Sequence, residues 1–323
     1  MRVFLTGGTG FLGGRLAAAL RARDDPVVAL VRSPERAGSL RELGCELVEG
    51  DLDSEAAIRA GVDGCDAVIH AAAEYRIGIP KSARPRMEAV NVAGTERVLD
   101  AAIEAGVQRI VHVSTTNVFG NTRGQVVEDT YERPRGEFLS AYDETKYRAH
   151  RAAQERIARG APVLIAAPGV LYGPGDTSQL GQQFRLAARG KLRYMSFPAL
   201  GFAAVYVDDA VDGILRVLDR GRIGETYVLG GQRTTMRESI ETAARVGGKR
   251  APRLVMPTWA INLSAPLGRW LGPLSGQPPN LREVVTASHG VTYWASDAKA
   301  REELGYAPRG LEAGLQELVR EAA

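Results

Sequence analysis

Cysteine and lysine are scarce in this chain of 323 residues, and long apolar runs are missing. The two cysteines, Cys45 and Cys65, cannot build a disulfide framework and lack the spacing of a metal site, so no metal is expected. No apolar run approaches the roughly 18 residues that span a membrane, and the N-terminus does not read as a signal peptide. These absences predict a cytoplasmic protein with no membrane partner.

A large net charge of either sign is also lacking, because 41 basic residues are nearly balanced by 38 acidic ones. No basic block and no basic patch interleaved with aromatic residues occurs in the sequence, so nucleic acid is not expected as a partner. There is no internal repeat and no low-complexity tract. The length and a hydrophobic content of 45% suit one large or two closely joined globular domains.

Short β-rich runs alternate with longer helical patterns over the first 230 residues. Strands are predicted at 2–6, 26–32, 45–50, 66–72, 108–114, 161–167 and 225–230, and helices at 11–23, 34–43, 54–60, 84–106, 141–159 and 208–219. Apolar strands separated by helices are typical of a parallel sheet covered on both faces. The sequence therefore predicts an α/β fold with a doubly wound parallel sheet, a Rossmann fold.

The rhythm changes after about residue 170, where Pro, Gly and isolated aromatic residues become more frequent. We expect residues 1–170 to form a dinucleotide-binding domain to which 205–230 return. Residues 171–204 and 231–323 are expected to form a smaller C-terminal lobe that binds the substrate. The apolar segment 257–272 has helical spacing and is expected to pack on this lobe or cover the site; a membrane-surface helix is disfavoured by its few basic residues.

Five glycines follow the first predicted strand in the stretch TGGTGFLGG and precede a predicted helix. In that context the stretch predicts a dinucleotide site. Gly7 would make the tight turn, Gly10 would let a pyrophosphate approach the backbone, and Gly13 would let helix and strand pack closely. The helix start, with Phe11 and Leu12, would offer free N–H groups to the phosphates.

The second predicted strand ends in VALVRSP, with Arg32 where an NAD-binding protein usually carries Asp or Glu. A guanidinium group favours a 2′-phosphate through its charge and its planar fork of donors, so NADP(H) is the expected cofactor. NAD(H) stays possible, since Arg32 could instead stack on adenine. The cofactor contacts expected after the third and fourth strands are Asp51, for the adenine amino group, and Leu52, Ala71, Ala72 and Ala73.

Tyr142 and Lys146 lie four residues apart in YDETK, early in a predicted helix, and so share one face of it. The ammonium group is expected to lower the pKa of the phenol from its reference value of about 10. Tyr142 would then serve as a general acid or base. Hydroxyl groups in VSTTNVFG, at the end of the fifth predicted strand, could donate a hydrogen bond to a carbonyl oxygen.

Taken together, the motifs resemble an extended short-chain dehydrogenase/reductase of the NAD-dependent epimerase/dehydratase superfamily, in its dihydroflavonol-4-reductase-like branch. They are TGGTGFLG, GDL, HAAA, NVAGT, VSTTNVFG, YDETK, PGVLYGPGD and VYVDDA, in family order over roughly residues 1–230. The resemblance implies Tyr142 as catalytic acid/base and Lys146 on the nicotinamide ribose. It implies Thr115 as the hydroxyl partner, with Ser114 as the fallback and as a cofactor contact.

The same resemblance implies further roles. Asn91 is expected to tether neighbouring backbone, and Pro168, Gly169 and Val170 are expected to line the nicotinamide pocket. The helix that carries YDETK and the helix before the fifth strand form a two-helix face in this family. That face is often a homodimer interface, so a homodimer is expected.

Two departures from the sugar-nucleotide members of the family favour a reductase. Gly169 and Val170 stand near the position where such members carry Asn, and Ala203 and Ala204 stand where they often carry Arg. A sugar-bound diphosphate would be poorly neutralised without these groups. We therefore expect an NADP(H)-dependent oxidoreductase that reduces a carbonyl of a small, moderately apolar substrate, or oxidises the matching alcohol.

Two other functions remain in view. An NDP-sugar epimerase or dehydratase is the first, because AAEYRIG and the C-terminal lobe also resemble proteins grouped as hopanoid-associated sugar epimerases. A non-catalytic NADP-binding regulator is the second, and the intact catalytic motifs argue against it. Candidates for the wall of the substrate pocket, each also readable as a core residue, are Tyr75, Arg76, Phe119, Leu171, Tyr172, Phe197 and Phe202.

Overall fold

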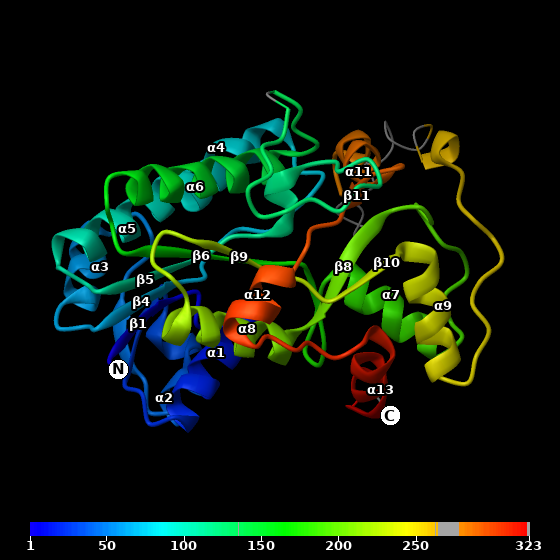
Figure 1. Cartoon of the computed structure of the whole chain (residues 1–323). Coiled ribbons are helices and arrows are strands. Elements are labelled where there is room, and N and C mark those ends of the chain that lie inside the picture. Colours follow the sequence, from blue (N-terminus) through cyan, green and yellow to red (C-terminus); the bar gives the residue numbers. More distant parts are fainter. Residues whose placement is uncertain (135, 262, 264–277, 322–323) are drawn as a thin grey trace.

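A seven-stranded parallel sheet forms the larger part of the molecule (Figure 1). The computed structural model describes residues 1–134, 136–261, 263 and 278–321. The strands of the sheet are β1 (Val3–Thr6), β2 (Val27–Val31), β3 (Glu46–Glu49), β4 (Ala67–His70), β5 (Arg109–Val113), β6 (Val163–Pro168) and β9 (Thr226–Leu229). Each overlaps its predicted range, and the predicted doubly wound α/β fold is confirmed.

The strand order β3-β2-β1-β4-β5-β6-β9 reverses direction between β1 and β4. All neighbouring strands are parallel, so their carboxyl ends meet at one edge. Ligands of such sheets bind outside the carboxyl ends at the point where the order reverses. The glycine loop after β1 and the small residues after β4 therefore lie at the expected place for a nucleotide.

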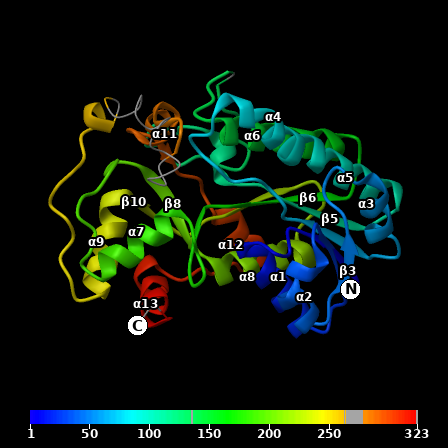
Figure 2. The ribbon, with the colours of Figure 1, turned by 180° about the vertical axis from the view of Figure 1, so that it is seen from behind.

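Helices cover both faces of this sheet (Figures 1 and 2). One face carries α1 (Phe11–Ala22), α2 (Gly38–Glu42), α8 (Val207–Arg220) and α12 (Ala298–Leu304), and the other carries α3 (Glu55–Val62), α5 (Gly94–Glu104) and α6 (Ala141–Ala158). Alternate strand residues serve the two cores: Val3 and Leu5 face one, and Phe4 faces the other. This burial on both faces explains why the strands read as continuous apolar runs.

The helix predicted at 84–106 is interrupted. It consists of α4 (Arg84–Glu88), a π-helical turn at Ala89–Ala93 and α5. Short 3-10 turns occupy Pro34–Arg36, Lys81–Ala83 and Thr116–Phe119.

A second, smaller sheet forms the core of the lobe, and the sequence did not predict it. Its strands are β7 (Val170–Tyr172), β8 (Gly201–Tyr206), β10 (Gln232–Thr235) and β11 (Thr292–Tyr293). The central strand β8 is antiparallel to β10 and parallel to β7 and β11. The helices of the lobe are α7 (Gln179–Ala188), α9 (Met236–Val246), α11 (Leu281–Ser288) and α13 (Leu311–Glu321).

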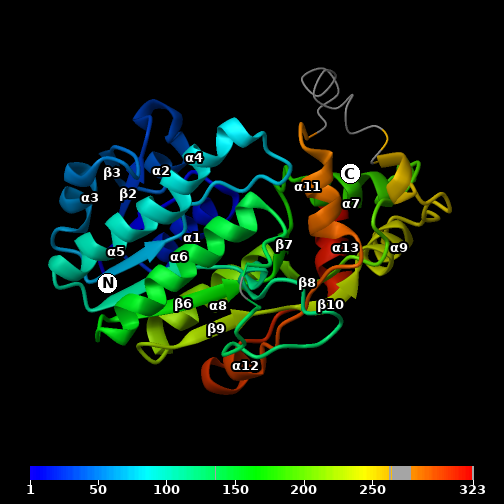
Figure 3. The same ribbon diagram turned by 90° about the horizontal axis from the view of Figure 1, so that it is seen from above.

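Figure 3 shows α11 at the border between the lobe and the helices α4 and α6. We call the larger sheet with its helices the body, and the smaller sheet with α7, α9, α11 and α13 the lobe. Helix α12 comes from the C-terminal range but packs on the body, where Ala300 and Leu304 join the core. The proposed boundaries at residues 170, 205 and 230 stay a prediction.

Of the apolar segment 257–272, residue 262 and residues 264–272 lie outside the described residues, while 258–261 are helical. Within the part of the chain that the structure describes, no helix combines the length and the apolar character needed to cross a membrane.

Candidate active site

The glycine loop connects β1 to α1 by a turn that only small residues allow. Gly7 has a φ of +80°, and a Cβ atom there would lie 2.8 Å from the backbone nitrogen of Ala72. A Cβ atom on Gly13 would lie 2.0 Å from the carbonyl oxygen of Gly7. The loop is thus pressed against the end of β4 on one side and against the first turn of α1 on the other.

The N-terminus of α1 has the properties of an anion site. Gly10 is its N-cap residue, no side chain caps it, and no acidic residue lies in its first turn. The partial positive charge of this helix end is therefore not neutralised by an acidic residue in its own first turn. These features fit the pyrophosphate of a dinucleotide.

The candidate adenosine contacts lie along the same edge. Arg32 is exposed directly after β2, and Leu52 is buried. The Asp51 carboxylate accepts hydrogen bonds from Ser54 Oγ at 2.9 Å and from the Asp53 nitrogen at 3.0 Å. These donors, with Ser54 first, lower the pKa of Asp51, which is therefore an ionised acceptor at neutral pH.

The candidate catalytic residues come from the end of β5 and the first turns of α6. Ser140 is the N-cap residue of α6, and its hydroxyl accepts a hydrogen bond from the Asp143 nitrogen. Tyr142 and Lys146 follow on one face of the helix, with 8% and 4% of their surfaces exposed. The structure brings both of them to the carboxyl end of β5.

The pKa of Tyr142 is raised, whereas the sequence predicted that Lys146 lowers it. Burial raises this pKa above its ordinary value, while a contact with the Thr115 side chain acts in the opposite direction. Lys146 Nζ donates a hydrogen bond to the carbonyl oxygen of Val113 at 2.9 Å, and its charge does not contribute to the pKa of Tyr142. Burial lowers the pKa of Lys146 itself to about 8.

The two candidate hydroxyl groups point to different places. Ser114 Oγ lies 2.9 Å from Nδ1 of His150 on α6. Thr115 begins the turn after β5, where its hydroxyl accepts from the Asn117 nitrogen, and its side chain also acts on Tyr142. Of the two, Thr115 has the contact with the phenol.

Asn91 tethers backbone as expected. In the π-helical turn its side chain accepts a hydrogen bond from the Glu74 nitrogen at 2.7 Å and donates to the Glu74 carbonyl oxygen at 3.1 Å. The next residue, Tyr75, is 59% exposed and lies edge-on to Tyr142, with ring centroids 4.8 Å apart. Asn91 thereby fixes the segment that flanks the phenol.

Three of the other pocket-wall candidates belong to the cores, whereas Arg76 is exposed and Leu171 and Phe197 are half-buried. Phe119, Tyr172 and Phe202 are buried, Phe119 beneath the turn after β5 and the other two within the lobe. Tyr172 packs edge-on against Phe184 and Tyr206 and donates a hydrogen bond to the Leu311 carbonyl oxygen. All three are therefore core residues of the fold.

Comparison with known proteins identifies the family. Residues 3–230 match the NAD dependent epimerase/dehydratase family. The chain belongs to that family. It is also 33% identical, over 96% of its length and 92% of the relative, to a ketoreductase of Stigmatella aurantiaca that is named for 4-hydroxy-2-methyl-3-oxo-4-farnesyl-3,4-dihydroquinoline-1-oxide. The resemblance to an extended short-chain dehydrogenase/reductase is confirmed, and the chain is an NAD(P)-dependent oxidoreductase of that type.

The chain is also similar, over nearly its whole length, to a second relative and to a solved structure. A putative dihydroflavonol 4-reductase of Synechocystis sp. is 27% identical over 98% of this chain and 93% of the relative. The crystal structure of a dTDP-glucose 4,6-dehydratase double mutant from Streptomyces venezuelae, with NAD bound, superimposes with a TM-score of 0.79. It is 26% identical and the match covers 99% of this chain and 96% of that one.

The structure adds a residue that the sequence argument missed. Glu283 of α11 is buried, and its carboxylate accepts hydrogen bonds from the backbone nitrogen of Ala141 and from Asn280 Nδ2. Ala141 is the first residue of α6 and directly precedes Tyr142, so a carboxylate of the lobe satisfies the N-terminus of the helix that carries the phenol. The spacing of Asn280 and Glu283 indicates a helix start, but nothing in the sequence links it to residue 141.

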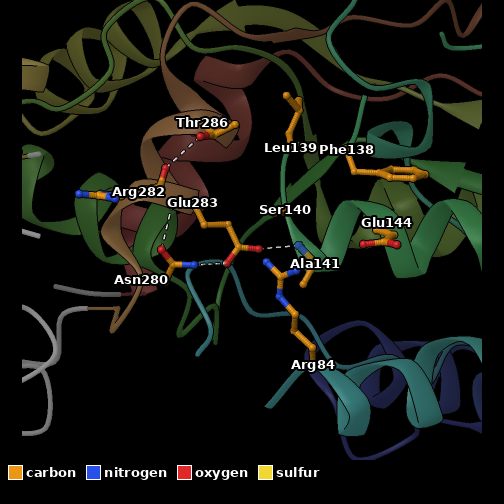
Figure 4. A pocket seen from close by; sticks show the side chains of 10 residues that line it. All are labelled: Arg84, Phe138, Leu139, Ser140, Ala141, Glu144, Asn280, Arg282, Glu283 and Thr286. Atoms are coloured by element: carbon orange, nitrogen blue, oxygen red, sulfur yellow. Dashed lines mark hydrogen bonds between the residues drawn. The ribbon is translucent and has the colours of Figure 1, made fainter. Parts of the chain in front are cut away.

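A pocket of about 270 Å³ lies at this junction (Figure 4). It is lined by Arg84, Phe138, Leu139, Ser140, Ala141, Glu144, Asn280, Arg282, Glu283 and Thr286. The three candidate catalytic residues do not line it. It marks the seam between α4, the start of α6 and α11, outside the predicted reaction centre.

A buried ion pair holds the other side of the same helix start. Arg133 donates to both carboxylate oxygens of Asp143, and the Asp143 carboxylate also accepts from the Leu139 nitrogen. The guanidinium group lies over the rings of Phe138 and Tyr147. The first turn of α6 is therefore anchored by the loop before it and by the lobe.

Three of the four histidines are buried, one each in β4, β5 and α6. His70 contacts Thr6 Oγ1 at 2.7 Å and Thr95 Oγ1 at 2.9 Å, which indicates a structural role. His112 stacks on His70, and neither of its ring nitrogens has a hydrogen-bond partner among the described residues. Burial, with the Lys146 ammonium second, lowers the pKa of His70 and His150 to about 3 and that of His112 well below its ordinary value.

Within the described ranges, no cluster of His, Cys, Asp or Glu could hold a metal ion.

Proposed function

We infer that this protein transfers hydride between NADP(H) and the carbonyl or alcohol of a small, moderately apolar substrate. The observation that carries the inference is the environment of Tyr142: a buried phenol in contact with Thr115, at the sheet edge that also holds the glycine loop. A proton donor and a second hydroxyl beside a nucleotide site are what a carbonyl reductase needs.

The cofactor, when bound, supplies or accepts the hydride. For binding it, we assign the pyrophosphate to the start of α1, with Gly7, Gly10, Phe11, Leu12 and Gly13. We assign the adenosine half to Arg32, Asp51 and Leu52, and the nicotinamide half to Ala71, Ala72, Ala73, Ser114, Lys146, Pro168, Gly169 and Val170. Their common place at the carboxyl ends of the strands supports the assignment.

Tyr142 suits the role of a proton donor to the carbonyl oxygen. Because burial raises its pKa, the phenol is protonated at neutral pH and can give its proton as the oxygen gains negative charge. Thr115 would orient the same oxygen. Lys146, with a pKa of about 8, is mostly charged at pH 7 and would hold the ribose hydroxyls next to Tyr142.

The preference for NADP(H) rests on Arg32. The residue is exposed at the end of β2, and the structure shows no hydrogen bond or ion pair that engages its guanidinium among the described residues. A fork of donors in that position suits a 2′-phosphate. NAD(H) is the alternative cofactor, since the dehydratase from Streptomyces venezuelae holds NAD.

The substrate class rests on two observations. The ketoreductase of Stigmatella aurantiaca is named for a ketone that carries a farnesyl group, which is strongly apolar. In this chain, Ala203 and Ala204 are buried in β8, so this stretch offers no charge to a sugar-bound diphosphate. Both favour an apolar carbonyl compound.

An NDP-sugar epimerase or dehydratase is the second candidate, favoured by the match to the dTDP-glucose 4,6-dehydratase. Such an enzyme would turn over an NDP-sugar with NAD and leave the cofactor unchanged at the end of each cycle. A non-catalytic regulator would bind NADPH and consume none with any substrate. We also expect a homodimer through the face formed by α4, α5 and α6, and a cytoplasmic location.

The first experiment is a titration of the nucleotide-free protein with NADPH and NADH, on wild type and on Arg32→Ala. We expect NADPH to bind about tenfold or more tightly than NADH, and Arg32→Ala to remove the difference, because a charge-assisted contact contributes on that order. Arg36→Ala, an exposed arginine four residues later, is the control and should keep the preference. Tight retention of NAD, with no effect of Arg32→Ala, would move the epimerase to first place.

A further inference from the structure

Two segments far apart in the sequence form the outer edge of the lobe. Residues 190–195 follow α7, and residues 249–256 follow α9. They run side by side, because the Met195 nitrogen donates to the Leu254 carbonyl oxygen at 3.0 Å and the Met256 nitrogen donates to the Met195 carbonyl oxygen at 2.9 Å. In Figure 1 the second segment runs along the margin of the lobe outside α9.

Basic residues outnumber acidic ones along this edge. The stretches 185–194 and 247–256 contain no acidic residue. Elsewhere, arginines such as Arg59, Arg148 and Arg216 pair with carboxylates. The exposed basic residues of the edge, for which the described chain provides no ion pair, are Lys191, Arg193, Lys249, Arg250 and Arg253.

Exposed apolar side chains lie within these two segments and directly after the second one. Leu254 is 61% exposed, Trp259 is 69% exposed and Leu263 is 73% exposed, the largest values for large apolar residues in the described chain. Tyr194, which adjoins Met195, is exposed as well. We call these four residues and the five basic ones the basic–apolar edge.

We propose that the basic–apolar edge docks the protein on an anionic lipid surface. Lysine and arginine near such a surface are attracted by its negative potential, and leucine and tryptophan enter the boundary between headgroups and acyl chains. Long basic side chains keep their charge at headgroup level while apolar neighbours go deeper. A nucleic acid would satisfy only the charges and leave Leu254 and Trp259 in water.

The sequence alone led to the opposite expectation, that of no membrane partner. Neither segment is a basic block by itself, and 53 residues lie between Met195 and the start of the second one at Lys249. The fold joins them. The proposal also fits the apolar substrate inferred above, which would dissolve in a lipid surface, but it does not depend on that function.

The test is flotation of the full chain with lipid vesicles, which requires no turnover. Vesicles of phosphatidylcholine alone are compared with vesicles that also contain phosphatidylglycerol. We expect binding to the anionic vesicles only, and weaker binding at about 1 M salt, where charges are screened within about 3 Å. Equal binding to both vesicles, or no binding to either, contradicts the proposal.

Two sets of variants separate charge from insertion. The triple variant Lys249→Glu, Arg250→Glu, Arg253→Glu is expected to bind anionic vesicles about tenfold more weakly or worse. A matched triple variant on the body, Arg36→Glu, Arg41→Glu, Arg159→Glu, should bind as wild type does. All these residues are exposed, and the circular-dichroism spectrum and thermal midpoint report that each variant is folded.

The double variant Leu254→Ser, Trp259→Ser keeps every charge and is expected to bind severalfold more weakly. Wild-type binding by this variant would show that the apolar residues do not enter the lipid, and would overturn that half of the proposal. Binding of heparin together with absence from anionic vesicles would identify a polyanion as the partner and overturn the whole.

Discussion

The body and the lobe use their charged groups in opposite ways. In the body, Lys146 and the Arg133–Asp143 pair are buried beside the carboxyl end of β5, and each has a partner within the body. In the lobe, the basic residues of the outer edge are exposed and lack carboxylate partners in the described chain. One lobe carboxylate, Glu283, is buried, and it reaches back to α6 of the body.

The difference indicates that the body and the lobe have different roles. Buried charges with fixed partners keep a constant geometry, which proton and hydride transfer require. Exposed charges and apolar groups are available to bind molecules outside the protein. We therefore expect changes in the body to act on the chemical step and cofactor binding, and changes in the lobe to act on substrate binding.

Tyr142→Phe should produce the largest effect on the body. Loss of the general acid is expected to lower kcat by about 100- to 10,000-fold, with NADPH binding unchanged. Steady-state kinetics and a nucleotide titration on the same preparation measure both. Tyr147→Phe, which removes a phenol hydroxyl one turn later on α6, is the control and should retain activity. Full activity of Tyr142→Phe would show that Tyr142 is not the proton donor.

The pH profile of kcat/KM for the reduction should show the deprotonation of Lys146. Because burial lowers its pKa to about 8, raising the pH through 8 removes the ammonium charge, and kcat/KM should fall by about tenfold per pH unit above that value. In Lys146→Arg the guanidinium stays charged, so this descending limb should disappear even if the overall rate is lower. A limb near pH 8 that persists in Lys146→Arg belongs to another group.

Glu283→Gln tests the link from the lobe to α6. The amide can still accept a hydrogen bond from Ala141 but brings no charge to the helix end, a loss of about 1 kcal/mol in the free energy of unfolding. We expect KM for the carbonyl substrate to rise severalfold while the Kd for NADPH stays constant. Glu312→Gln removes an exposed lobe carboxylate that pairs with Arg245, and should change neither. A changed NADPH affinity in Glu283→Gln would break the division between body and lobe.

Lowering the pH should decrease the free energy of unfolding because three histidines of the body are buried. His70, His112 and His150 are buried with lowered pKa values, so below about pH 6.5 the unfolded chain takes up protons that the folded chain refuses. The free energy of unfolding should therefore fall as the pH falls from 7 to 5. His112→Leu should reduce this slope by about 1 kcal/mol per pH unit, as measured by urea unfolding at several pH values.

The body was predictable because its signals are local. Each strand is a short apolar run, and the glycine loop and YDETK carry their spacing within a few residues. The lobe sheet was missed because β7, β10 and β11 are two to four residues long and pair through β8 with partners distant in the chain. The contact of Glu283 with Ala141 spans 142 positions, and no local pattern marks it.

The error about Tyr142 has a similar origin. Helical spacing correctly placed Lys146 on the same face, but it could not show that the ammonium donates to Val113 or that the phenol is buried. Desolvation then outweighs the nearby charge. Charge arguments from sequence are therefore weakest where burial is greatest.

The central claim is net hydride transfer, and the most direct measurement is the amount of NADPH consumed per molecule of substrate converted. The purified protein is mixed with NADPH and a panel of apolar ketones and aldehydes, and separately with NAD and NDP-sugars. We predict that one NADPH is oxidised for each carbonyl reduced, and that no NDP-sugar is converted. Conversion of an NDP-sugar with no net change in the cofactor would contradict the account.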